Sequence, residues 1–217
     1  MAIGVSQPVE SRTVVRRRAV VEEALDHAQA IVAAQGAGAV TVSEIARRMG
    51  MRAPSLYKYF PSLHAIYDGL FARGNNTLND YIDEAVRDVE PGLDRLLEGA
   101  RAFTRWGTRE VGLAPLLFWR PIPGFEPSPE SFAPSQALWQ RTRDELKAAV
   151  QRRQLTKAAD SEEAQRKLTI LISGVCSQQL ANQPGAPFAD GLFTSLTDEV
   201  LDMFVSYYSP PERKVRR

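Results

Sequence analysis

The chain has 217 residues, of which 44% are hydrophobic and 24% are charged, and its net charge is +1. These values are ordinary for a soluble globular protein, and the single cysteine excludes an internal disulfide framework. No apolar run approaches the roughly 18 residues that span a bilayer, and the N-terminus lacks the pattern of a signal peptide, so we expect a cytoplasmic protein with no membrane partner.

The charge is distributed unevenly along the chain. Residues 1–73 hold nine Lys and Arg against six Asp and Glu, residues 74–209 hold 14 against 19, and residues 210–217 hold four against one. A mildly basic N-terminal part ahead of an acidic body suits a head that binds nucleic acid, although an ordinary solvated surface produces a bias of this size as well.

The spacing of apolar residues predicts helices along the chain and no convincing strand. The fold class is therefore all-α, with about nine helices. The expected helices cover residues 12–35, 41–49, 53–60, 62–89, 93–111, 113–120, 135–154, 161–183 and 192–208. The segment 121–134 contains five prolines and is expected to be a loop. Residues 1–11 and the basic tail 210–217 are expected to be disordered.

Two short helical patterns stand almost back to back within residues 41–62. Thr41 is placed to cap the first one, and Glu44 can reach back to complete a capping box. Gly50 supplies the tight turn that follows, and Pro54 suits the first turn of the second helix, where a missing N–H is tolerated. This pattern is a helix-turn-helix, whose second helix enters the major groove of DNA.

The outward positions of the second helix offer a cation, a hydroxyl group, small apolar surface and an aromatic ring. Such a set provides hydrogen bonds to base edges or phosphates and contacts to thymine methyl groups. The predicted DNA-contacting residues on this helix are Arg52, Ala53, Pro54, Ser55, Lys58 and Tyr59. The basic cluster at residues 16–18 is either a further grip on the DNA backbone or a solvated patch.

At these residues the chain resembles the tetracycline-repressor (TetR) family of transcriptional regulators. The matching residues are Thr41, Ile45, Ala46, Gly50, Met51, Ser55, Leu56, Tyr57, Tyr59, Phe60 and Ser62. The resemblance covers about fifty residues, and the remaining helices agree with the family's ligand-binding and dimerisation domain. It implies domains at residues 12–61 and 62–209, and it implies that Tyr57 and Tyr59 lie near phosphates. Core packing is the alternative for Tyr57. Thr41 and Ser43 complete the expected DNA-binding set.

The chain departs from the family pattern at one position just after the helix-turn-helix. The family commonly has a lysine there, at the start of the fourth helix, where it meets a phosphate. This sequence has Leu63, followed by His64. Either His64 substitutes for the lysine or the backbone amides of the helix N-terminus bind the phosphate alone.

Nothing in the sequence favours catalysis, and we expect neither an enzyme nor a cofactor or metal. The two histidines, His27 and His64, both lie in the head, and no phosphate loop, GxGxxG or metal-ligand spacing occurs. Cys176 stands in an apolar helix and is expected to be a buried hydrophobic residue as well as a pocket neighbour.

The body is rich in aromatic residues that fall in or beside the helices expected to surround a pocket. Core packing explains each one singly, but together they suit an apolar cavity of a few hundred Å³. The expected pocket residues are Phe103, Trp106, Leu117, Phe118, Phe125, Trp139, Cys176 and Gln179. The last two helices are apolar over a broad face and are expected to form a four-helix bundle between two subunits. The expected dimer residues are Leu168, Leu171, Ile172, Val175, Leu196, Val200 and Phe204.

The sequence therefore predicts a homodimeric, DNA-binding transcriptional regulator. We expect a repressor that a small apolar effector releases from a palindromic double-stranded operator. Two alternatives stay open: a constitutive DNA-binding regulator with no ligand, and a helical partner-binding module whose head does not bind DNA.

Overall fold

The computed structural model describes residues 11–211, and within them the chain forms nine α-helices and no strand. The head consists of α1 (Arg12–Gln35), α2 (Val42–Arg48) and α3 (Ala53–Leu56), with a short 3₁₀ helix, η1 (Ala37–Ala39), between α1 and α2. The prediction of an all-α fold is confirmed. The predictions for residues 1–10 and 212–217 lie outside the described residues.

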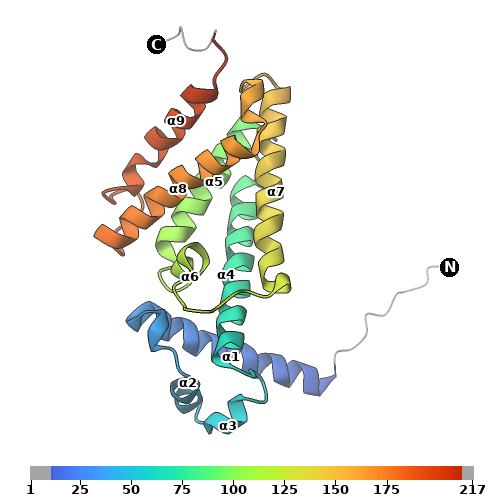
Figure 1. The fold of residues 1–217 in the computed structure, drawn as a ribbon, viewed down its shortest axis with the longest axis vertical. Helices are drawn as coiled ribbons and strands as arrows, with labels where there is room; N and C mark the ends of the chain where they lie inside the picture. Colours follow the sequence, from blue (N-terminus) through green and yellow to red (C-terminus); the bar gives the residue numbers. More distant parts are fainter. Residues whose placement is uncertain (1–10, 212–217) are drawn as a thin grey trace, which may run out of the picture.

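The body is built from six α-helices, and the first of them, α4, connects it to the head (Figure 1). They are α4 (Leu63–Val86), α5 (Leu93–Arg109), α6 (Ala114–Trp119), α7 (Pro129–Gln151), α8 (Glu162–Asn182) and α9 (Thr197–Tyr208). Two more 3₁₀ helices, η2 (Lys157–Ala159) and η3 (Thr194–Leu196), precede α8 and α9. None of the helices in this part of the chain combines the length and hydropathy that a bilayer span requires.

Serine caps explain where several helices begin. The hydroxyl groups of Ser62, Ser128 and Ser161 accept the N–H of the residue three positions later, at 3.1–3.2 Å. Each bond satisfies one of the N–H groups that the first turn of a helix leaves without a partner. Helix α5 is preceded by a glycine instead: the N–H of Gly92 donates to Glu145 of α7, and that of Leu93 donates to Gln154, just after α7.

The expected loop at residues 121–134 is partly wrong, because α7 begins at Pro129 and contains Pro134. Pro129 stands in the first turn, where its missing N–H is no loss. The cap at Ser128 is reinforced by Asp68 of α4, whose carboxylate accepts from the Ser128 N–H at 2.7 Å and from the hydroxyl groups of Ser128 and Ser131. This contact across 60 residues fixes the start of α7.

A polar seam joins α4 to α7 beyond that cap. Asn75 donates to the carbonyl oxygen of Ser131 and accepts from the hydroxyl group of Ser135 at 2.6 Å. Further along, Asn79 accepts from Arg141 at 2.6 Å, and Asp83 forms an ion pair with the same guanidinium group. The seam holds α4 and α7 side by side along the body (Figure 1).

Helix α4 is also fixed to the head. Arg73 donates to Glu22 at 2.6 Å and to Asp26 at 2.7 Å, both on α1, and its side chain is largely buried. The hydroxyl group of Tyr67 donates to the carbonyl oxygen of Ala37 at 2.7 Å. One hydrophobic cluster runs from α1 through α2 and α3 into α4, α5 and α6, so the first half of α4 packs as part of the head.

Candidate functional site

Helix α3 is short, and the helical path continues beyond its last residue. The N–H of Tyr59 donates to the carbonyl oxygen of Leu56 at 2.9 Å, and that of Phe60 donates to the same oxygen at 3.1 Å. Leu56 and Phe60 are buried in the head. The backbone can turn sharply ahead of α3 because Gly50 has φ of +65°, a conformation that other residues rarely adopt. As a result α3 projects from the end of the molecule away from the body (Figure 1).

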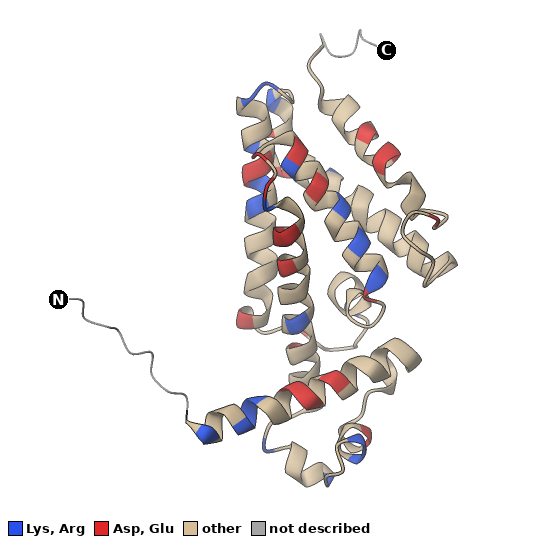
Figure 2. Cartoon of the chain, turned by 180° about the vertical axis from the view of Figure 1, so that it is seen from behind, with Lys and Arg blue, Asp and Glu red and all other residues tan. Residues whose placement is uncertain are grey.

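The side chains predicted to contact DNA form one surface around α2 and α3. Thr41, Ser43, Arg52, Pro54, Tyr57, Lys58 and His64 are exposed, whereas Ala53, Ser55 and Tyr59 are partly buried. Tyr57 is 51% exposed, so the structure does not place it in the core. Basic residues lie in α2, around α3 and in the first turns of α1, and acidic residues follow further along α1 (Figure 2).

Thr41 caps α2 as expected, because its hydroxyl group accepts the N–H of Glu44 at 3.1 Å. The second half of the predicted capping box is wrong. The Glu44 carboxylate turns to Arg47 and Arg48, three and four positions later, and binds both at 2.8 Å. These hydrogen bonds lower the pKa of Glu44 to about 2. A charge-assisted pair outcompetes a bond to a single backbone N–H.

Arg17 makes two contacts that join α1 to the helical segment that continues α3. Its guanidinium group donates to the carbonyl oxygen of Lys58 at 3.1 Å and lies over the ring of Tyr59, 5.3 Å from the centroid. A cation beside the last carbonyl groups of a helix is favourable, because those groups carry partial negative charge. Within the basic cluster at residues 16–18, Arg17 therefore binds groups of the chain itself.

His64 stands in the first turn of α4, next to the cap at Ser62, and its side chain is exposed. Its ring meets the edge of Phe125, with centroids 6.0 Å apart. Phe125 also contacts Tyr67 and Phe71 of α4. Phe125, expected in the ligand pocket, thus anchors the loop before α7 to the start of α4.

A cavity of about 760 Å³ lies in the body between five helices, α4 to α8. Its apolar walls come from every one of these helices, and they include Leu78, Ile82, Phe103, Phe118, Leu138 and Ile172. Five charged side chains also line it: Asp83, Arg95, Arg141, Asp144 and Glu145. The size and the mixture of apolar walls with a few polar groups are typical of a small-molecule site.

The structure brings four of the eight predicted pocket residues together. Phe103, Leu117, Phe118 and Trp139 line the cavity. Trp106 is buried in the core that runs from the head, and the thiol of Cys176 lies 3.8 Å from the carbonyl oxygen of Thr104. Burial raises the pKa of this thiol to about 12.

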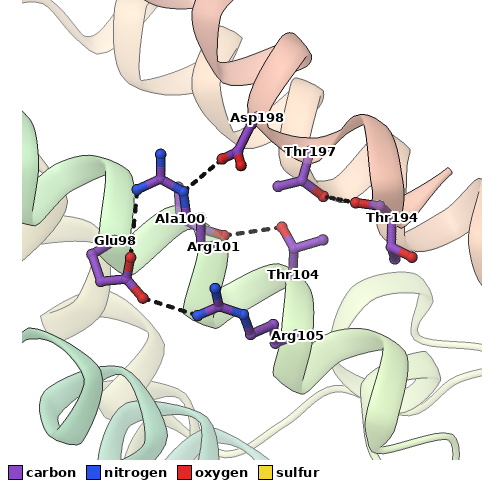
Figure 3. A network of polar contacts seen from close by, with 8 residues as sticks. All are labelled: Glu98, Ala100, Arg101, Thr104, Arg105, Thr194, Thr197 and Asp198. Carbon is purple, nitrogen blue, oxygen red and sulfur yellow. Dashed lines mark hydrogen bonds and ion pairs between the residues drawn. The ribbon is translucent and has the colours of Figure 1, made fainter. Parts of the chain in front are cut away.

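Gln179, the remaining predicted pocket residue, is buried and holds the chain that leads into α9. Its side-chain oxygen accepts the N–H groups of Phe193 and Thr194, and its amide donates to the carbonyl oxygen of Gln183 at 2.7 Å. A polar network beside it joins α5 to α9 (Figure 3). There Arg101 donates to Asp198 at 2.6 Å, and Glu98 accepts from Arg105 at 2.9 Å. These polar side chains bind partners within the chain and do not line the cavity.

The predicted dimer residues divide between the inside and the outside of the chain. Leu168, Ile172, Val175 and Phe204 are buried in the chain's own core, and Leu168 and Ile172 also line the cavity. Leu171 and Val200 are partly buried, and Leu196 is exposed. The side chains that α8 and α9 present outward are Ile170, Met203 and Tyr207, each 64–69% exposed. The choice of Leu168, Ile172, Val175 and Phe204 is therefore corrected, because a helix that is apolar on two faces does not reveal in its sequence which face is internal.

Sequence reasoning missed the polar side of the cavity. Asn75 and Asp83 of α4 line the cavity, and neither was among the predicted pocket residues. A signal was present, because Asn75, Asn79 and Asp83 repeat at four-residue intervals and must share one face of a helix. The long-range partner on α7, Arg141, had no comparable signal.

The geometry of the head agrees with known proteins. Residues 24–68 match the family described as "Bacterial regulatory proteins, tetR family". The HTH-type transcriptional regulator Rv1816 of Mycobacterium tuberculosis is 28% identical over 100 residues, which are 45% of this chain and 43% of the relative. The match thus spans less than half the length of that relative.

Two solved structures share the fold over most of the chain. The putative regulatory protein SCO4313 is 21% identical, with a TM-score of 0.71 over 90% of this chain and 100% of the other. The transcriptional regulator FadR from Bacillus subtilis, solved in complex with stearoyl-CoA, is 17% identical, with a TM-score of 0.71 over 85% and 97% of the two chains. At these identities the likeness concerns the fold.

Proposed function

We propose that the chain is a member of the tetR family, which its N-terminal residues 24–68 match, and that it is a homodimeric, DNA-binding transcriptional repressor released from its operator by a small effector. The observation that carries the proposal is the surface of α2 and α3. It projects from the end of the molecule and exposes Arg52, Tyr57 and Lys58 together. Cations and aromatic side chains on an exposed recognition helix suit contacts with phosphates and base edges.

A dimer supports this function, because one recognition helix of this length reads few base pairs. Two heads related by a twofold axis meet successive major grooves about 34–36 Å apart. The exposed apolar side chains of α8 and α9 supply a self-complementary surface for such a pair, led by Ile170, Met203 and Tyr207.

The cavity supports control by an effector. Its walls include α4, whose first half packs with the head, so a ligand that contacts α4 reaches the element that positions α3. The mechanism we propose is a shift of population between two arrangements of the paired heads, limited by the ligand's differential affinity for them. FadR, a protein of the same fold, was solved with stearoyl-CoA bound, which is consistent with ligand control in this fold.

The direct test begins with selection of bound fragments from random or genomic DNA, followed by fluorescence anisotropy on the fragment recovered. The double variant Arg52→Ala, Lys58→Ala should bind this DNA at least tenfold more weakly, because it removes two exposed cations from each head. Lys147→Ala, which removes an exposed cation from α7, is the matched control and should bind normally.

The outcomes separate the alternatives. Unchanged binding by the double variant would show that α3 is not the DNA-reading element. Failure to recover any DNA, together with no salt-dependent affinity for duplex DNA, would favour a partner-binding module. Binding to DNA that no small molecule ever weakens would favour a constitutive regulator.

A further inference from the structure

The cavity in the body is polar at one end and aromatic at the other. Helices α4 and α7 run away from the head, whereas α5 and α8 run toward it (Figure 1). The position of each lining residue along its helix therefore tells how far it lies from the head. The end far from the head is lined by the charged side chains Asp83, Arg95, Arg141, Asp144 and Glu145. The end near the head is lined by the rings of Phe103, Phe118 and Trp119 and by hydroxyl groups of α8. From Ser135 to Glu145, ten helical steps of α7 make the cavity about 15 Å long.

Both guanidinium groups at the charged end are already engaged by the chain. Arg141 donates to Asp83 and Asn79, and Arg95 donates to the carbonyl oxygen of Val89 at 2.6 Å. Glu145 lies 3.8 Å from Arg95. Each arginine already has an acceptor within the chain, so neither needs an anionic ligand as a partner.

A carboxylate is left over once these pairs are made. Three acidic side chains face two arginines, so the charged end carries a net charge of −1. Asp144 is the one whose partner in the chain is neutral: it accepts from the amide of Gln140 at 3.0 Å. A negative end of this kind attracts a positively charged group and repels a phosphate or carboxylate.

Two tryptophans that line the cavity are also partly exposed to solvent. Trp119 of α6 is 46% exposed and Trp139 of α7 is 40% exposed, and both line the cavity. The indole nitrogen of Trp119 donates to the hydroxyl group of Ser177 at 3.1 Å, and both residues line the cavity. Exposed tryptophan rings beside a cavity suit both a flat apolar body and a cation, since the ring face carries negative charge density.

We propose that the effector is a lipophilic cation, a molecule with an amine or quaternary ammonium group at one end and an apolar body about 15 Å long. The ammonium group lies at the end lined by Asp144 and Glu145, and the apolar body extends toward Phe103 and Phe118. This inference rests on the proposed function, since it concerns the same cavity. It distinguishes this chain from an acyl-CoA-binding regulator, whose ligand carries phosphates.

The test uses four ligands that share one chain length: dodecyltrimethylammonium, dodecanol, dodecanoate and dodecanoyl-CoA, each below its micellar concentration. Binding to the full-length protein is followed by the fluorescence of Trp119 and Trp139 and by calorimetry. The cation is expected to bind at least tenfold more tightly than dodecanoate or dodecanoyl-CoA, with dodecanol between them.

Two variants tie the preference to the cavity. Asp144→Lys reverses the net charge of the polar end from −1 to +1 and should reverse the preference between dodecyltrimethylammonium and dodecanoate. The matched control is Asp88→Lys, which makes the same change at an exposed position that does not line the cavity. Gly174→Phe should abolish binding of all four ligands, because Gly174 lines the cavity and a Cβ atom there meets nothing within 4 Å.

Tighter binding of dodecanoate or dodecanoyl-CoA by the natural chain would overturn the inference and leave the proposed regulator intact. So would a preference for the cation that Asp144→Lys leaves unchanged. Absence of binding by all four ligands would also overturn it, and release of operator DNA by any other small molecule would show separately that the proposed function stands.

Discussion

Replacing Arg17 separates a residue that positions the recognition helix from one that binds DNA. In the structure its guanidinium group donates to the Lys58 carbonyl oxygen and stacks on Tyr59. A hydrogen bond to a charged group contributes about 1.5–3 kcal/mol, and an exposed cation–π contact contributes about 0.5–1 kcal/mol. Because Arg17 is exposed, we take the low end and expect Arg17→Ala to weaken DNA binding by about 1–2 kcal/mol per head, or about 5- to 30-fold.

The salt dependence of binding distinguishes the two roles. Loss of one phosphate contact per head lowers the slope of log K against log salt concentration by about 0.9, and therefore by about 1.8 for a dimer. Loss of a positioning contact weakens binding while the slope stays the same. Anisotropy titrations of the natural chain and Arg17→Ala at four salt concentrations measure both quantities.

Arg16→Ala is the matched control, because it removes the same charge from the same helix without touching Lys58 or Tyr59. Arg17→Lys keeps the charge but lacks the planar group that stacks and donates, so it should not restore affinity. A slope that falls by about 1.8 in Arg17→Ala and recovers in Arg17→Lys would refute the positioning role and show that Arg17 binds phosphate.

Three further predictions concern packing, chemistry and assembly. Within α5, Gly99→Ala should raise Tm by about 1–4 °C through helix propensity, because the new Cβ makes ordinary contacts at 3.8 Å. Gly107→Ala should lower Tm by about 2–8 °C, because its Cβ would lie 2.9 Å from Phe118 and 3.0 Å from the thiol of Cys176; equal thermal scans of both variants would contradict this packing. The thiol of Cys176, with its pKa raised to about 12, stays protonated at pH 8 and should react with a disulfide reagent only in denaturant; rapid labelling of the folded protein would show that the site opens. The double variant Ile170→Glu, Met203→Glu should be a monomer by light scattering while Gln136→Glu remains a dimer, and an unchanged mass would exclude this face of α8 and α9 as the interface.

The sequence was sufficient for most helices because their apolar spacing and their caps agree. Thr41 caps α2 as expected, Ser62 caps α4, and Gly50 adopts the positive φ that its turn needs. It was insufficient where distant residues decide the local structure. The start of α7 at Pro129 depends on Asp68, about sixty residues earlier, and the start of η3, which leads directly into α9, depends on Gln179 of α8.

The candidate sites divide in the same way. The residues of α3 are contiguous in sequence, so their pattern was readable and their exposure follows from the burial of Leu56 and Phe60. The cavity arises where five helices cross, and no local pattern shows which polar residue faces it. For this reason Asp144 and Glu145 were passed over, and Trp106 was assigned to a pocket that it does not line.

The single uninterrupted helix α4 has a geometrical consequence. Its 24 residues make a rod about 36 Å long, clamped to the head by Arg73 and to α7 by the polar seam. Leu78 in the cavity wall lies about 15 residues, or about 22 Å, from the end of α4 that packs with the head. A tilt of about 5° therefore displaces each head by about 2 Å and changes the separation of a pair by about 4 Å, which exceeds the 3.4 Å rise of one base pair. In the proposed dimer, a rotation of this size is enough to move the two α3 helices out of phase with the DNA.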